Sequence, residues 1–143
     1  MAVLDPAGDS PDIGIGIGIG IGIVVADLES MSRFYEGVLG LVRVAERRYD
    51  SGTQMIVLRC GSTRIKLNRP APPPSAKSPQ GAHRDASGIR YLTFTVADAE
   101  RAHAELADAG AELDAAVRTS PAGRLFFARD PEGNNIEILQ PGR

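Results

Sequence analysis

The chain has 143 residues and a formal net charge of −2, which argues against the strongly basic surface that nucleic-acid binding requires. Its single cysteine, Cys60, excludes an internal disulfide framework. The sequence shows no basic leader and no apolar run of about 20 residues, so we expect neither secretion nor membrane insertion. We therefore expect one domain in a cytoplasmic protein, whose abundance of Ala, Arg, Gly and Asp is typical of a bacterial source.

The first distinctive segment is "DIGIGIGIGIGIVVADLE", residues 12–29. Strand alternation places the isoleucines on one face and leaves glycine alone on the other. The glycines do not have the G-x-G-x-x-G spacing of a dinucleotide-binding loop. Residues 1–18 are predicted to be an N-terminal extension, in which the Ile-Gly repeat is either a tolerated expansion or additional strand, and the fold begins at Ile19.

The rest of the first half, residues 19–69, predicts a strand to Ala26, a helix and three further strands. The helix is expected over Ser30–Gly37, and the strands over Val42–Tyr49, Gln54–Arg59 and Thr63–Asn68. Residues 70–88 are rich in proline and small polar residues, which predicts an exposed connector.

The second half, residues 89–140, repeats this order. It predicts a strand over 89–97, a helix over 98–110 and strands over 111–118, 124–129 and 135–139. The Asp that ends the opening strand recurs 71 residues later, at Asp27 and Asp98, and the same separation relates Lys66 to Glu137. This internal repeat predicts an α+β fold of two βαβββ modules that form one shared cavity.

Three segments, "VVADLESMSRFYEGVLGL", "LTFTVADAERAHAELADAGAEL" and "LFFARDPEGNNIEIL", resemble the vicinal oxygen chelate superfamily. That superfamily includes glyoxalase I, extradiol dioxygenases, methylmalonyl-CoA epimerase and bleomycin-resistance proteins, and the resemblance covers residues 19–140. It implies the same pair of modules, but it says little about function because the fold hosts many chemistries.

The resemblance also implies where a divalent metal would bind. The four family positions are occupied here by Gly20, Lys66, Tyr91 and Glu137. Only Glu137 is a usual ligand, since glycine offers no donor, an ammonium repels a dication and tyrosine is rarely a ligand. We therefore expect no metal and no cofactor.

Strand parity predicts which side chains line the cavity and which pack beneath the helices. The cavity set is Gly20, Gly22, Val24, Arg64, Lys66, Asn68, Tyr91, Thr93, Thr95 and Glu137, with Asn135 and Leu139 as further candidates. The packed set is Ile21, Ile23, Ile65, Leu67, Leu92, Phe94, Val96, Ile136 and Ile138.

The cavity set suggests a proton-transfer enzyme of the isomerase, epimerase or lyase type. Lys66 and Glu137 can exchange protons if they pair, while Tyr91 donates a hydrogen bond to a carbonyl or enolate oxygen. Alternatively, Lys66 and Glu137 form a salt bridge in a protein that binds a natural product, as bleomycin-resistance relatives do. A further alternative is a metal-dependent glyoxalase or dioxygenase, which requires a shifted strand register or ligands other than those expected here. We expect a small-molecule partner, no nucleic acid or membrane, and a homodimer.

Other residues give weaker indications. A basic cluster either recognises a carboxylate, with Arg47 and Tyr49 among the substrate-binding residues, or is an ordinary charged sheet surface. Its members are Arg43, Arg47, Arg48, Tyr49, Arg59 and Arg64. His103 is predicted to be structural, at the edge of a helical apolar stripe. His83 either lies over the cavity mouth or, as we expect, is solvated in the connector. Cys60 has no partner that indicates a nucleophile.

Overall fold

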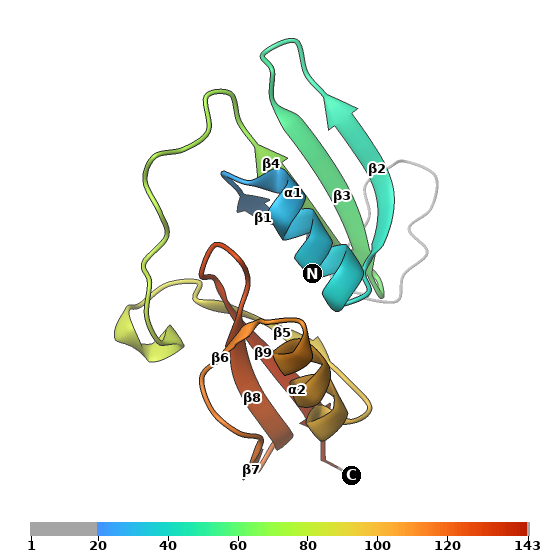
Figure 1. Cartoon of the computed structure of the whole chain (residues 1–143), viewed down its shortest axis with the longest axis vertical. Coiled ribbons are helices and arrows are strands. Elements are labelled where there is room, and N and C mark those ends of the chain that lie inside the picture. The colour runs from blue at the N-terminus through green and yellow to red at the C-terminus, as the bar shows by residue number, and fades with distance from the viewer. Residues whose placement is uncertain (1–19, 143) are drawn as a thin grey trace, which may run out of the picture. The chain divides into compact units, whose positions relative to one another are not determined.

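The computed structural model describes residues 20–142, so the repeat over residues 13–18 lies outside the described part of the chain. The chain divides into two compact units, one ending at Pro74 and the other beginning at Ser75. Figure 1 shows a sheet and a helical segment in each unit. No helix in the described residues is long and apolar enough to cross a membrane.

Unit 1 is a four-stranded sheet with one helical segment. Its strands are β1 (Gly20–Val24), β2 (Val42–Arg48), β3 (Gln54–Cys60) and β4 (Thr63–Arg69), in the spatial order β1-β4-β3-β2. β1 runs parallel to β4, and the other pairs are antiparallel. The α-helix α1 (Leu28–Ser32) continues directly into the π-helix η1 (Arg33–Val38) between β1 and β2.

Unit 2 has the same plan. The 3₁₀-helix η2 (His83–Asp85) precedes β5 (Tyr91–Thr95) and α2 (Ala99–Asp108). The remaining strands are β6 (Glu112–Leu113), β7 (Arg118–Ser120), β8 (Gly123–Arg129) and β9 (Asn135–Pro141). The sheet order is β5-β9-β8-β6, with β7 also paired to β8 and with β5 parallel to β9.

The repeat is maintained in the hydrogen-bonding register. Gly22 pairs with Lys66 in unit 1, and Thr93 pairs with Glu137 at the equivalent positions of unit 2. The strand-end Asp caps the following helix in both units: Asp27 accepts a hydrogen bond from the Ser30 amide, and Asp98 accepts one from the Arg101 amide, each at 3.0 Å. These caps satisfy helix N–H groups that lack intrahelical partners. They explain why the sequence repeats an aspartate at this point.

The core of each unit lies between its sheet and its helix. The predicted alternation holds at most positions: the packed set is buried or half-buried, and Gly20, Gly22, Val24, Arg64, Lys66, Tyr91, Thr93 and Thr95 of the cavity set are exposed. Asn68, Glu137 and Leu139 are half-buried, and the candidate Asn135 is buried because the connector covers it and accepts its hydrogen bond at Gly81. The fully buried large side chains include Met31, Tyr35, Leu58, Ile65, Leu67, Phe126, Ile136 and Ile138. A one-residue shift of any strand would exchange these two sets, so the register is strongly specified.

The first helix differs from the prediction of a regular helix over Ser30–Gly37. From Arg33 onward it has π-helical turns, and the Leu39 amide bonds the Phe34 carbonyl five residues earlier at 3.0 Å. Phe34 and Tyr35, which are neighbours in sequence, are both buried and make an edge-to-face contact with ring centroids 5.2 Å apart. The wider turn is compatible with both rings entering the core.

The strand predicted over residues 111–118 is broken into β6 and β7. Between them Asp114 pairs with Arg129, with Nη2 and Oδ1 2.8 Å apart, and the Ala115 carbonyl lies 3.0 Å from Nε2 of His103. The side chains of Arg129 and His103 therefore hold the segment between β6 and β7, which a continuous strand would hold by backbone hydrogen bonds to its neighbour. His103 also contacts Phe126 edge to face, which confirms its predicted structural role.

Candidate functional site

Each sheet has one face covered by its helix and one face that the helix does not cover, which we call the open face. On the open face of unit 1, Arg64 and Lys66 of β4 lie beside Gly20 and Gly22 of β1. A Cβ added at either glycine would meet no other atom within 4 Å. Their backbone conformations do not require glycine, so the missing side chains leave free space beside the two cations.

Asn68 completes the predicted set on this face. Asn68 is half-buried, and its Oδ1 atom has no hydrogen-bond partner within residues 20–142. Of the more distant predicted residues, Arg47 of β2 pairs with Met55, whereas Tyr49 lies beyond the end of β2 in the turn before β3. Tyr49 is 47% exposed.

The open face of unit 2 holds the second predicted group. Glu137 of β9 pairs with Thr93 of β5, and the Thr93 hydroxyl donates a hydrogen bond to Glu137 Oε1 at 3.0 Å. Tyr91, two residues before Thr93 and 44% exposed, is on the same face, as is Thr95. This unit therefore brings together a half-buried carboxylate held by a hydroxyl and an accessible phenol.

An aromatic cluster that the sequence analysis did not identify adjoins this group. Phe127 of β8 is paired with Glu137, and its ring stacks on the His83 imidazole with centroids 4.0 Å apart and planes 9° apart. Tyr91 contacts both rings edge to face, at 5.4 Å from His83 and 5.2 Å from Phe127. Strand parity along β8 places Phe127 on the open face, a signal that was present in the sequence.

The expectation of a solvated His83 is wrong because the connector packs on unit 2. Asn135, which is buried, donates from Nδ2 to the Gly81 carbonyl at 3.2 Å, and the Ser78 hydroxyl donates to Asn134 Oδ1 at 3.1 Å. Arg90 also donates from Nε to the His83 carbonyl at 3.4 Å. The bonds from Asn135 and Ser78 are long-range, and together with the bond from Arg90 they hold the 3₁₀-helix, and with it His83, against the sheet.

The proposed pairing of Lys66 with Glu137 joins a residue of unit 1 to a residue of unit 2. It stays a prediction, as does a cavity shared by the modules.

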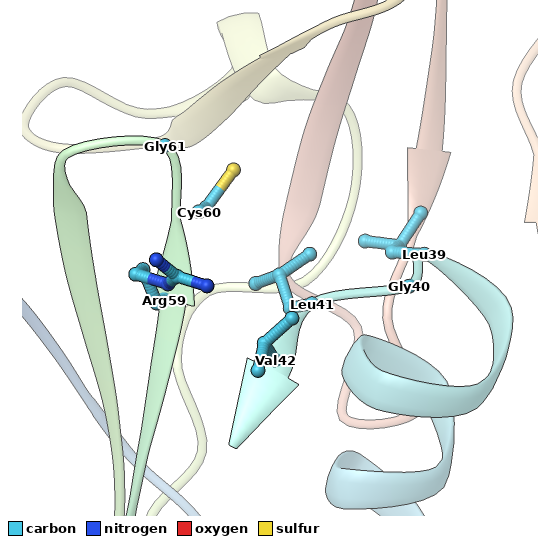
Figure 2. Close-up of a pocket in the computed structure, with 7 residues that line it drawn as sticks. All are labelled: Leu39, Gly40, Leu41, Val42, Arg59, Cys60 and Gly61. Carbon is cyan, nitrogen blue, oxygen red and sulfur yellow. The ribbon is translucent and has the colours of Figure 1, made fainter. Parts of the chain in front are cut away.

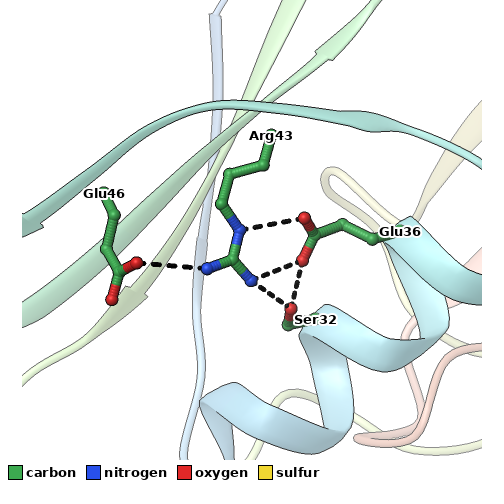
Figure 3. Close-up of polar contacts among 4 residues, drawn as sticks. All are labelled: Ser32, Glu36, Arg43 and Glu46. Carbon is green, nitrogen blue, oxygen red and sulfur yellow. Dashed lines mark hydrogen bonds and ion pairs between the residues drawn. The ribbon is translucent and has the colours of Figure 1, made fainter.

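The predicted basic cluster divides between the two faces of the unit 1 sheet. Arg43 lies on the helix side, where its Nε and Nη2 atoms donate to the two oxygens of Glu36 at 2.9 and 2.7 Å, and Nη1 donates to Glu46 at 3.2 Å. Ser32 also donates to Glu36 and accepts from Arg43 (Figure 3). The bidentate hydrogen bond from Arg43 is the main cause that lowers the pKa of Glu36.

A shallow pocket of about 430 Å³ lies in unit 1, where the π-helix leads into β2 and β3 ends. Figure 2 shows Leu39, Leu41 and Val42 on one side of it, and Arg59 and Cys60 on the other. Its walls combine apolar side chains with one guanidinium group. Cys60 is a half-buried free thiol, and residues 20–142 provide it with no basic partner that would indicate a nucleophile.

The donors do not fit a divalent metal. Of the four positions that the family resemblance assigns to ligands, Gly20 has no donor atom and Lys66 carries a positive charge on the same face. Within residues 20–142, no group of three or more His, Cys, Asp or Glu side chains could hold a metal ion. A tetrahedral or octahedral site needs more carboxylate or imidazole donors than Glu137 supplies alone.

Comparisons with known proteins agree with this architecture. The family model described as the Glyoxalase/Bleomycin resistance protein/Dioxygenase superfamily matches residues 19–138. YwkD of Bacillus subtilis (strain 168), described as an uncharacterized protein, is 33% identical over 122 residues, which are 82% of this chain and 91% of YwkD.

Two solved structures show the same fold. A glyoxalase family protein from Bacillus cereus has a TM-score of 0.74 and 26% identity, over 85% of this chain and 91% of that one. TnmS3, an antibiotic binding protein from Streptomyces sp. CB03234, has a TM-score of 0.66 and 23% identity, over 92% of this chain and 100% of its own.

Proposed function

We propose a function for this chain, which belongs to the glyoxalase/bleomycin resistance protein/dioxygenase superfamily: it binds a small organic molecule on the open face of unit 2 and removes a proton from it. The observation that supports this most directly is the hydrogen bond from Thr93 to Glu137. It fixes one carboxylate oxygen, while the other accepts no hydrogen bond within residues 20–142. A positioned carboxylate with a free oxygen has the geometry of a general base.

The proposed step is abstraction of a proton from a carbon beside a carbonyl group. Glu137 takes the proton, the electron pair of the C–H bond becomes part of an enolate, and the Tyr91 hydroxyl donates a hydrogen bond to the enolate oxygen. Return of the proton to the opposite face of the same carbon gives an epimer. Where that carbon carries a hydroxyl group, transfer of the hydroxyl proton to the enolate oxygen and return of the carbon-bound proton to the former carbonyl carbon gives an isomer. The step uses no metal, in keeping with the poor fit of the donor set.

The aromatic cluster favours ligands with a flat or apolar part. Tyr91, which is 44% exposed, presents a ring surface on the same face as Glu137, and the buried Phe127 ring supports it by an edge-to-face contact. Such rings bury large apolar area while keeping a defined geometry. The same feature supports a second candidate function, the binding of a natural product without reaction. The structural neighbour TnmS3 is named as an antibiotic binding protein.

Proton exchange in heavy water distinguishes these two functions. The protein, treated with a chelator, is incubated in D₂O with a panel of small α-hydroxyketones, 2-oxo acids and 1,3-dicarbonyl compounds, and replacement of C–H by C–D is followed by proton NMR. An enzyme of the proposed type accelerates exchange for at least one compound, and Glu137→Gln lowers that rate by roughly 10²- to 10⁴-fold without unfolding the protein.

The other outcomes are also informative. A compound that binds saturably but exchanges no proton faster than in buffer would support the natural-product-binding function. Exchange that is abolished by the chelator and restored by a divalent metal would contradict the metal-free step.

A further inference from the structure

The open face of unit 1 carries three positive charges close together. Arg59 of β3 and Arg64 of β4 are directly opposite in the antiparallel register, and Lys66 is the next residue on the same face of β4. All three side chains are exposed. Like charges placed directly opposite on neighbouring strands destabilise a sheet. The arrangement therefore has a cost that an anion would relieve.

Within residues 20–74, no acidic side chain on this face offsets the charge. The register and the alternation of the strands place the following residues on it: Gly20, Gly22, Val24, Val42, Ala45, Arg47, Met55, Val57, Arg59, Arg64, Lys66 and Asn68. None is an aspartate or a glutamate. The ion pairs that unit 1 forms within residues 20–74 involve Arg33 and Arg43 instead.

Space for a ligand adjoins the cations on two sides. Gly20 pairs with Arg64 and Gly22 with Lys66, and no Cβ fills the space above either glycine. On the other side, Arg59 lines the pocket of about 430 Å³ together with Leu39, Leu41 and Val42 (Figure 2). A polar anchor thus lies beside an apolar wall.

We propose that this face of unit 1 binds the carboxylate or phosphate group of a small organic anion, whose apolar part lies against the pocket wall. Arg59 and Arg64 donate hydrogen bonds to the oxyanion, because guanidinium groups match the geometry of carboxylate and phosphate oxygens, and Lys66 contributes a point charge. The inference concerns unit 1 alone and does not depend on the reaction proposed for unit 2.

Two probes test the proposal at low ionic strength: inorganic phosphate, which has only the oxyanion, and benzoate, which adds an apolar ring. Binding is measured by NMR titration of the backbone amides and arginine Nε–Hε groups. Both probes should shift the signals of Arg59, Arg64 and Lys66 saturably, and Arg64→Gln should weaken both affinities by about tenfold. Val42→Ser, at a side chain that is 50% exposed, should weaken benzoate binding alone.

Arg48→Gln is the matched control. Arg48 is an exposed arginine of the same sheet that pairs with Gln54, on the opposite parity to Arg59, so its loss lowers the net charge equally without changing the open face. Its affinities should stay within twofold of the wild type. An equal loss in Arg48→Gln and Arg64→Gln, or shifts that never saturate, would mean counter-ion screening only and would overturn the proposal.

If Arg64→Gln does not fold, as judged from its amide spectrum, Arg59→Gln provides the same test. Failure of anion binding in a protein whose Glu137-dependent proton exchange is intact would refute this inference and leave the proposed function standing. The reverse result would refute the proposed function alone.

Discussion

Replacing Gly22 by valine tests whether the open face of unit 1 is free of packing. Gly22 has no positive φ and no neighbour within 4 Å of an added Cβ, and the next residue on the same face, Val24, is a valine that is 59% exposed. Glycine within a strand costs about 0.5–1 kcal/mol, and valine fits a pleated strand well. We therefore expect Gly22→Val to raise the free energy of unfolding by about 1 kcal/mol.

For a chain of this size, that gain corresponds to an increase of about 4 °C in Tm. Urea and thermal unfolding followed by circular dichroism measure both quantities. The control is Gly123→Ala, at another strand glycine: Gly123 has φ +139, and its Cβ would lie 2.1 Å from the Gln140 carbonyl oxygen. This control should lose more than about 2 kcal/mol. A loss of stability in Gly22→Val comparable to that of the control would refute the description of the face as open.

Two further predictions concern the contacts that stabilise each unit. Glu36→Gln should lower the free energy of unfolding by about 1 kcal/mol at pH 7. The pKa of Glu36 in the folded state is lowered from 4.5, so the extra stability of the wild type over Glu36→Gln is present above that value and is lost as the pH falls through the lowered pKa. Urea titrations measure this difference in free energy of unfolding, and a difference that stays constant from pH 7 to pH 3 would contradict the prediction. His83→Ala should remove the stack on Phe127, cost about 1 kcal/mol and speed amide exchange in residues 81–85, whereas unchanged exchange would show that the stack does not hold the connector.

Much of the fold could be predicted from the sequence because the repeat and the alternation are both local patterns. The separation of 71 residues between Lys66 and Glu137 corresponds to equivalent register positions, with Gly22 and Thr93 as their partners. Alternating apolar residues then specify which side of each strand is buried. These patterns are sufficient to place the candidate site residues on the open faces.

The parts that could not be predicted depend on contacts between residues distant in sequence. The composition of the connector indicated an exposed loop, but hydrogen bonds from Asn135 and Arg90 hold it on unit 2 and bring His83 onto Phe127. In the sequence the basic residues form a single group. In the structure, the register shift between Arg43 and Ala45 of β2 turns Arg43 to the helix side of the sheet, away from the cations of the open face. Neither effect leaves a periodic signal in the sequence.

We propose that ligands bind the open faces of the two sheets. The decisive experiment is a nitrogen–proton correlation spectrum of the protein, recorded with and without a compound that the D₂O assay identifies. We expect shifts concentrated at Tyr91, Thr93 and Glu137, with little change at Phe94 and Ile138, which are buried on the helix side. Shifts concentrated at the helix-covered residues instead would contradict the proposal.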